Sequence, residues 1–185
     1  MNTSVNQYRP FLYFLLRFAV TYLVLTIGYA TYLDQFDAKT KEVDSMTQLV
    51  AEQSKSLLQW VDSTAHTEPN PKEVGVKLFY KGQWIARIIE GCNAVSVIIL
   101  FVSFVIAFRG KIKALIWFIP AGVLLIHFAN ISRIALLAIA LYHYPNAEHL
   151  LHGVLFPFAI YGIVFLLWMV WVNRFSKLAA THVSK

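Results

Sequence analysis

The chain has 185 residues, enough for one compact domain, and its composition excludes an ordinary soluble protein: 58% of the residues are hydrophobic, 14% are charged, and the mean hydropathy is +0.57. The net charge of +6 does not indicate a nucleic-acid partner, because the basic residues flank apolar runs and no RNP, zinc-finger or helix-turn-helix pattern is present. The single cysteine, Cys92, excludes an intrachain disulfide. These features predict an all-α, polytopic membrane protein with one membrane domain over residues 1–185.

Four apolar segments are long enough to cross a bilayer, which takes about 20 helical residues. They are predicted at about residues 10–33, 88–108, 114–142 and 153–173. The first contains Arg17, whose long side chain reaches the interface. The third is too long for a simple crossing, so it either extends beyond the lipid or breaks near Asn130.

A polar loop, residues 34–83, separates the first two spans and contains eight acidic residues and six lysines. Apolar residues recur in it at spacings of three, four, seven and four, at Val43, Met46, Val50, Leu57 and Val61. This spacing predicts an amphipathic helix from about Lys41 to Asp62 that packs on the outer surface of the bundle. Pro69 and Pro71 then predict a turn.

The distribution of charge predicts how the chain is oriented. Segments 1–17, 109–113 and 174–185 contain eight Lys and Arg residues and no Asp or Glu. The positive-inside rule places these three segments, and with them the N- and C-termini, in the cytoplasm. All ten acidic residues then lie outside or at the outer interface.

Three reactive side chains from different spans are predicted to lie at the same depth. Counted at about 1.5 Å per residue from the cytoplasmic basic residues, Cys92 is about 25 Å, Arg133 about 30 Å and His152 about 33 Å away. The hydrocarbon core is about 30 Å thick, so all three would lie near its outer boundary.

Arg133 has the clearest physical argument among them. A charge inside an apolar segment costs several kcal/mol unless it is paired, hydrated or near an interface. It is therefore either a functional group or a structural arginine that reaches the interface or pairs with Glu90 or Glu148. Asn130, three residues earlier, shares its helix face and either holds the guanidinium, binds substrate or bonds to another helix.

Cys92 is either an inert packing residue or a nucleophile. Its predicted place near the N-terminus of the second span favours an ionised thiol through the helix dipole. His152 would supply the acid/base that a cysteine nucleophile needs, with His143 and His149 as rivals, and Glu90 either orients the histidine or balances charge. No ligand cluster supports a metal site and no nucleotide-binding motif is present, so no metal or cofactor is expected.

Three fragments occur in order along consecutive spans: Glu90-Gly91-Cys92-Asn93-Ala94, Asn130-Ile131-Ser132-Arg133 and His152-Gly153. Together, over about residues 80–172, they resemble the exosortase/archaeosortase family of membrane cysteine transpeptidases, and the setting resembles its short variant XrtF. The resemblance implies that Cys92 is the nucleophile, that Arg133 stabilises the thiolate or the oxyanion, and that His152 is the acid/base. It implies substrates that are membrane-anchored proteins with a C-terminal sorting signal, processed at the outer face of the cytoplasmic (inner) membrane.

The chain departs from the family pattern in two places. Many members have more spans and a Cys-Ser-Gly-like setting where this chain has Asn93-Ala94, and the loop 34–83 has no counterpart in the matched fragments. Two other functions stay open. In a non-catalytic scaffold or assembly component of a surface-export system, Cys92 would tolerate serine or alanine. A small transporter subunit would bind an anion through Arg133, but few other polar groups lie within the spans.

Overall fold

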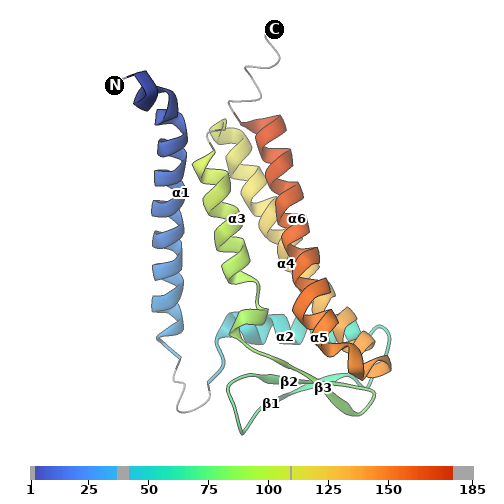
Figure 1. Cartoon of the computed structure of the whole chain (residues 1–185). Helices are drawn as coiled ribbons and strands as arrows, with labels where there is room; N and C mark the ends of the chain where they lie inside the picture. Colours follow the sequence, from blue (N-terminus) through green and yellow to red (C-terminus); the bar gives the residue numbers. More distant parts are fainter. Residues whose placement is uncertain (1–2, 37–41, 109, 177–185) are drawn as a thin grey trace.

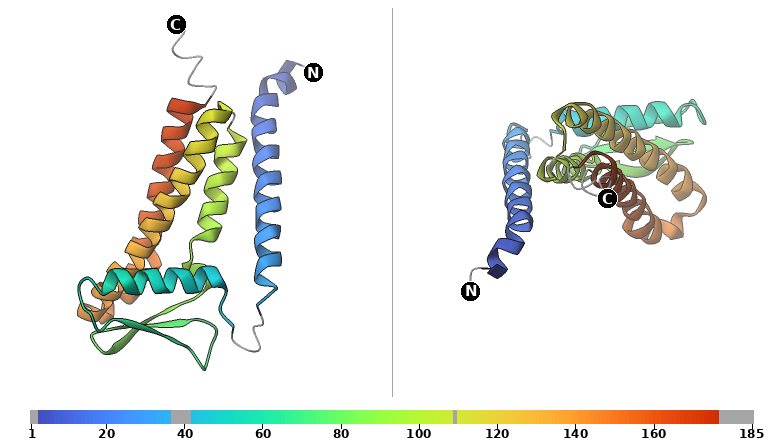
Figure 2. Two further views of the ribbon diagram at one scale, coloured as in Figure 1. Left: turned by 180° about the vertical axis from the view of Figure 1, so that it is seen from behind. Right: turned by 90° about the horizontal axis from the view of Figure 1, so that it is seen from above.

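Four helices form the body of the molecule, with a crosswise helix and a small sheet at one end (Figure 1). The computed structural model describes residues 3–36, 42–108 and 110–176. The four helices are α1 (Thr3–Leu33), α3 (Val95–Ala107), α4 (Ile112–His143) and α6 (Phe156–Val170). The start of α1 and the end of α6 lie at the same end of the bundle, opposite the sheet (Figures 1 and 2). This architecture confirms the predicted all-α, polytopic membrane fold.

Three described segments are long and apolar enough to cross a membrane: Tyr8–Leu33, Ile112–His143 and Pro145–Phe175. The third of these includes three short elements before α6, namely η2 (Pro145–Ala147), α5 (Glu148–Leu150) and η3 (Leu151–Leu155), and one after it, η4 (Trp171–Phe175). The remaining apolar helix, α3, has 13 residues and is about 20 Å long, less than the thickness of a hydrocarbon core.

The second span therefore differs from the helix predicted over residues 88–108. Its first part is the end of a strand followed by the 3₁₀ turn η1 (Glu90–Cys92), and α3 begins only at Val95. The helix starts late because Ala94 has a left-handed backbone (φ 62°, ψ 10°), which a right-handed helix cannot contain. Hydropathy alone did not reveal this break, because it does not report the backbone conformation of Ala94.

The third apolar segment is one continuous helix, α4, of 32 residues. It does not break near Asn130, and it continues through Pro120, which removes a single backbone donor. At about 1.5 Å per residue α4 is about 48 Å long. It leans across the bundle and extends past α3 to contact α2 and the sheet (Figure 1).

The crosswise helix is α2 (Ser45–Leu58), which is shorter than the amphipathic helix predicted over residues 41–62. The Asp44 side chain accepts a hydrogen bond from the Thr47 backbone N–H at 2.9 Å and caps its N-terminus. The buried face of α2 is Thr47, Val50, Ala51, Ser54 and Leu58. Of the predicted apolar face, Val50 is fully buried, whereas Val61 lies beyond the helix and is 66% exposed. The predicted first residue, Lys41, lies outside the described residues.

A three-stranded antiparallel sheet follows α2, where the sequence had predicted only a turn. Its strands are β1 (His66–Pro69), β2 (Val76–Tyr80) and β3 (Gln83–Ile88), in the order β1-β2-β3. In β2 every second residue is buried, and a two-residue turn with positive φ at Lys81 and Gly82 joins β2 to β3. The alternation over residues 76–80 and the Lys-Gly pair were the available signals.

Two separate cores hold the molecule together. The first, called the outer core because it lies at the sheet end of the bundle, joins α2, β2 and the second half of α4. Its buried apolar residues include Val50, Leu78, Ile134 and Ala138. The core within the spans joins α3, α4 and α6 around Phe101, Phe118, Val164 and Trp171. α4 contributes residues to both cores, so it links α2 and the sheet to the bundle of spanning helices.

Gly122 allows the close contact between α3 and α4, and its substitution tests that packing. A Cβ atom at this position would lie 2.3 Å from the ring of Phe101, which is fully buried. We expect Gly122→Ala to destabilise the protein by about 1–3 kcal/mol through overpacking, seen as a lower midpoint of thermal denaturation in detergent. In the control Gly162→Ala, the added methyl meets nothing within 4 Å, so the midpoint should not fall. Equal midpoints for the two variants would contradict the tight packing.

Candidate active site

Cys92 lies in the turn η1, between the end of β3 and the start of α3. Its side chain is half-buried and packs against the outer core. Its backbone N–H donates to the Ile89 carbonyl at 2.8 Å, which closes the 3₁₀ turn. The thiol is therefore carried by a short 3₁₀ turn at the sheet end of α3, near the N-terminus of that helix as predicted.

Asn93 anchors this turn to three other elements. Its side chain is 1% exposed and donates to the Tyr29 hydroxyl at 2.8 Å and to the Thr47 hydroxyl at 3.2 Å. The Asn93 side-chain oxygen accepts the Val95 backbone N–H at 2.9 Å, at the start of α3. The residue after the cysteine thus connects α1, α2 and α3. Sequence reasoning assigned no role to Asn93, because a buried asparagine has no signature without its partners.

Asn130 holds the cysteine residue itself. Its side-chain amide donates to the Cys92 backbone carbonyl at 2.7 Å, and Asn130 is 1% exposed. The sequence had left three roles open for Asn130: holding the guanidinium, binding substrate or bonding to another helix. In the structure it bonds to another element, the turn η1, at the main chain of the candidate nucleophile. Asn130 is therefore placed to position Cys92.

Arg133 lies one turn beyond Asn130 on α4, and its side chain is close enough to Cys92 to interact electrostatically. Its Nε atom is buried and has no hydrogen-bond partner among the described residues. None of the ion pairs formed within residues 3–36, 42–108 and 110–176 includes Arg133, so the predicted alternative of a pair with Glu90 or Glu148 is not present. A buried guanidinium N–H is thus left without a partner beside the cysteine.

Glu90 and His152 do not bond to the Cys92 turn as Asn130 does. Glu90 is half-buried at the start of η1 and interacts with Tyr29, and no hydrogen bond or ion pair joins it to a histidine in the described parts. His152 is exposed in η3, a π-helical segment. The neighbouring α5 is set apart laterally from the turn before α3 (Figures 1 and 2). The structure thus gathers Cys92, Asn130 and Arg133, and leaves His152 on the surface.

The remaining histidines have other surroundings. His127, to which the sequence assigned no catalytic role, has its Nε2 atom 2.7 Å from the Gln53 side-chain oxygen, so it joins α4 to α2. His143 and His149 are exposed. Among the described residues, no three His, Cys, Asp or Glu side chains lie close enough together to hold a metal ion.

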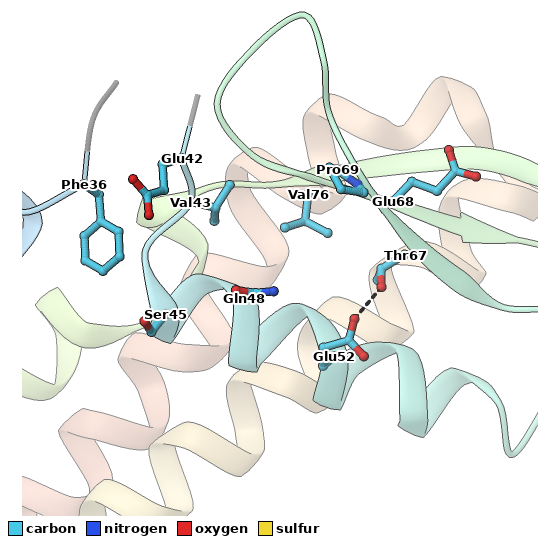
Figure 3. A pocket seen from close by; sticks show the side chains of 10 residues that line it. All are labelled: Phe36, Glu42, Val43, Ser45, Gln48, Glu52, Thr67, Glu68, Pro69 and Val76. Atoms are coloured by element: carbon cyan, nitrogen blue, oxygen red, sulfur yellow. Dashed lines mark hydrogen bonds between the residues drawn. The ribbon is translucent and has the colours of Figure 1, made fainter. Parts of the chain in front are cut away.

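Two cavities formed by the described residues do not include Cys92. One, of about 370 Å³, lies between α2, β1 and the residues after α1, and its walls carry Glu42, Glu52 and Glu68 (Figure 3). The carboxylate of Glu52 accepts hydrogen bonds from Lys55 and Thr67, which lower its pKa. A second, of about 610 Å³, lies between α4 and α6 at the opposite end. Cys92 lines neither of these two cavities; it lies in the turn η1.

A family model described as transmembrane exosortase (Exosortase_EpsH) matches residues 10–173. The chain belongs to the transmembrane exosortase family. The matched range includes both the four helices and the outer loop 34–83, which the sequence fragments left unmatched. Comparisons with curated proteins and with solved structures gave no match. Membership establishes a multi-pass membrane protein and indicates an enzyme of the cysteine-transpeptidase type.

Whether the bond from Asn130 to the Cys92 carbonyl holds the turn of this exosortase closed can be tested by labelling the thiol. Cys92 is the only cysteine, so N-ethylmaleimide labelling reports on it alone. Losing a buried hydrogen bond costs about 1–3 kcal/mol, so the turn should open more often in Asn130→Ala. We expect the labelling rate of purified protein to rise about tenfold. The control Asn146→Ala changes an exposed asparagine and should leave the rate unchanged. An unchanged rate in Asn130→Ala would mean that this bond does not hold the turn.

Proposed function

We propose that the protein is a membrane-embedded cysteine transpeptidase or peptidase that processes the C-terminal sorting signals of surface-bound proteins. One observation carries the proposal: in a member of the exosortase family, the Asn130 bond holds the Cys92 turn beside Arg133. A cysteine in a packing role needs no buried cation nearby, whereas a cysteine nucleophile and the oxyanion that it generates both gain from one.

The reaction begins when Cys92 gives its thiol proton to His152 and the resulting thiolate sulfur bonds to the carbonyl carbon of the scissile peptide. The displaced electron pair moves to the carbonyl oxygen, and the resulting oxyanion accepts hydrogen bonds from Arg133, whose Nε has no other partner. When the oxyanion collapses, the C–N bond breaks, the downstream amine takes a proton from His152, and a thioester remains on Cys92. Asn130 keeps the turn in place throughout.

The second half of the reaction releases the processed protein. An amine acceptor, or water, attacks the thioester carbon and loses a proton to His152, and the Cys92 sulfur leaves as the thiolate. With an amine the enzyme transfers its substrate to a new anchor, and with water it acts as a protease. Neither half-reaction uses a metal ion or an organic cofactor.

The place of the turn supports the proposed substrate class. A protein tethered by its own C-terminal helix presents the residues before that helix at the membrane surface, which is the level of η1 at the end of α3. We propose that this surface is the outer face of the cytoplasmic membrane of a Gram-negative bacterium, that both termini are cytoplasmic, and that the subtype is the short exosortase XrtF. The positive-inside rule supports this orientation, although Arg109 and residues 177–185 lie outside the described residues.

Replacing the nucleophile tests the proposed function directly. In a native host that carries Cys92→Ala, proteins with a C-terminal helix and basic tail should accumulate at their unprocessed size, because no thioester can form. Immunoblots of membrane fractions measure this accumulation and also verify insertion of the variant. The control Ser96→Ala changes an exposed small residue in the first turn of α3 and should process normally. Normal processing by Cys92→Ala would favour a non-catalytic scaffold of a surface-export system.

His149 and His152, which are both exposed, offer a matched test of the acid/base. Removing a general acid/base typically lowers a rate by about 10²–10⁴-fold. We expect His152→Ala to slow processing in this range, as measured by pulse-chase of a substrate identified with Cys92→Ala, while His149→Ala, one turn earlier and equally exposed, stays near the wild-type rate. Equal rates for the two variants would remove His152 from the mechanism without affecting the role of Cys92.

A further inference from the structure

β3 is an edge strand that leads directly to Cys92. The order β1-β2-β3 means that, within the described residues, one side of β3 has no strand beside it. Only Ile89 separates the end of β3 from η1, and its backbone is itself extended (φ −123°, ψ 173°). The extended backbone of the sheet therefore continues as far as the turn that ends at Cys92.

The opposite edge of the sheet is less available to a further strand. The Thr67 hydroxyl on β1 donates to the Glu52 carboxylate on α2 at 2.6 Å, and β1 ends at Pro69, which has no backbone N–H. Proline and a covering element are two of the means by which proteins prevent additional pairing at a sheet edge. β3 contains no proline, and its first two residues, Gln83 and Trp84, are exposed.

Trp84, near the start of β3, bonds to the main chain of the same strand. The indole N–H of Trp84 donates to the Ala86 carbonyl at 3.0 Å, and the Trp84 side chain is 54% exposed. The Lys77 ammonium on β2 lies 4.7 Å from the centre of the Trp84 ring. The exposed part of this ring is available to the side chains of an incoming strand.

We propose that the extended segment of the substrate that precedes the scissile bond pairs with the free edge of β3 as a fourth strand. The inference rests on the proposed function and adds the mode of substrate binding. Main-chain hydrogen bonds to a strand supply affinity that is largely independent of sequence, while contacts at alternate side chains supply specificity. The occupant is an unfolded peptide segment that continues into a membrane helix.

The position of Cys92 determines the direction of the added strand. The turn follows the Ile88 end of β3, so the scissile bond must also lie at that end. The residues before the scissile bond then run alongside β3 from its Gln83 end towards its Ile88 end. The added strand is therefore parallel to β3, and β3 accommodates about six substrate residues.

A proline scan of a substrate tests this pairing. The substrate is one that accumulates unprocessed in Cys92→Ala, and each of the six residues before its cleavage site is replaced by proline in turn. Proline removes a backbone donor, and in a strand only alternate donors face the neighbour. Processing by the wild-type enzyme should fall about tenfold at every second position and change less than about twofold at the positions between. Uniform tolerance, or uniform loss without alternation, would overturn the inference.

Cross-linking supplies a second measurement that does not depend on proline. A photo-reactive benzoylphenylalanine is placed at Gln83 or Trp84 on β3, or at exposed Glu68 on β1 as the control, each in the Cys92→Ala background. The β3 positions should cross-link to the six residues before the cleavage site of the identified substrate, and Glu68 should not. Cross-links from Glu68 alone, or to another part of the substrate, would overturn the inference.

These outcomes are distinct from failure of the proposed function. If Cys92→Ala processes its substrates normally, the enzyme assignment fails before any strand is tested. If Cys92→Ala blocks processing while the proline scan shows no alternation and the β3 positions give no cross-link, the enzyme assignment stands and the substrate binds elsewhere.

Discussion

The turn that carries Cys92 is non-helical backbone beside membrane-spanning helices, and its polar groups must be satisfied by the protein. Lipid offers no partners for free N–H and C=O groups, so irregular backbone near a bilayer is stable only where other side chains or water bond to it. Asn93 and Asn130, both almost fully buried, provide these bonds from within the turn and from α4. The short α3 creates the need for them, since a longer helix would have satisfied the same backbone internally.

Helix α2, which packs against the sheet, is hydrogen-bonded to the residue that follows Cys92. Asn93 bonds to Thr47 on the buried face of α2, and α2 packs on the half of α4 that carries Arg133. The contact between His127 and Gln53 is a further polar link between the same two helices. Movement of α2 or of the sheet would therefore alter the position of Cys92.

Hydropathy was enough to predict an all-α polytopic membrane protein, because crossing a bilayer imposes a minimum apolar length. It was not enough to find the start of α3, because the left-handed Ala94 and the turn before it are built from residues that also occur within helices. The sheet was missed because strands of four to six residues give only a short alternation, as over residues 76–80, which is a weaker signal than the periodicity of a long helix. Counting residues predicted Cys92 and Arg133 at one depth. It did not reveal that Asn130 bonds to Cys92, which is the contact that joins α4 to the turn.

Under the proposed function, the unpartnered Nε of Arg133 has a consequence for catalysis. A buried donor without an acceptor costs about 1–3 kcal/mol in the free enzyme. That cost is relieved when a negatively charged oxygen forms beside Cys92, which happens in the transition state and not in the bound substrate. An interaction gained only there lowers the barrier without tightening substrate binding. A salt bridge from Arg133 to Glu90 would have removed this advantage, because the guanidinium would already be satisfied before the reaction began. Among the described ion pairs none includes Arg133, so under the proposed function its guanidinium is still available to the oxyanion.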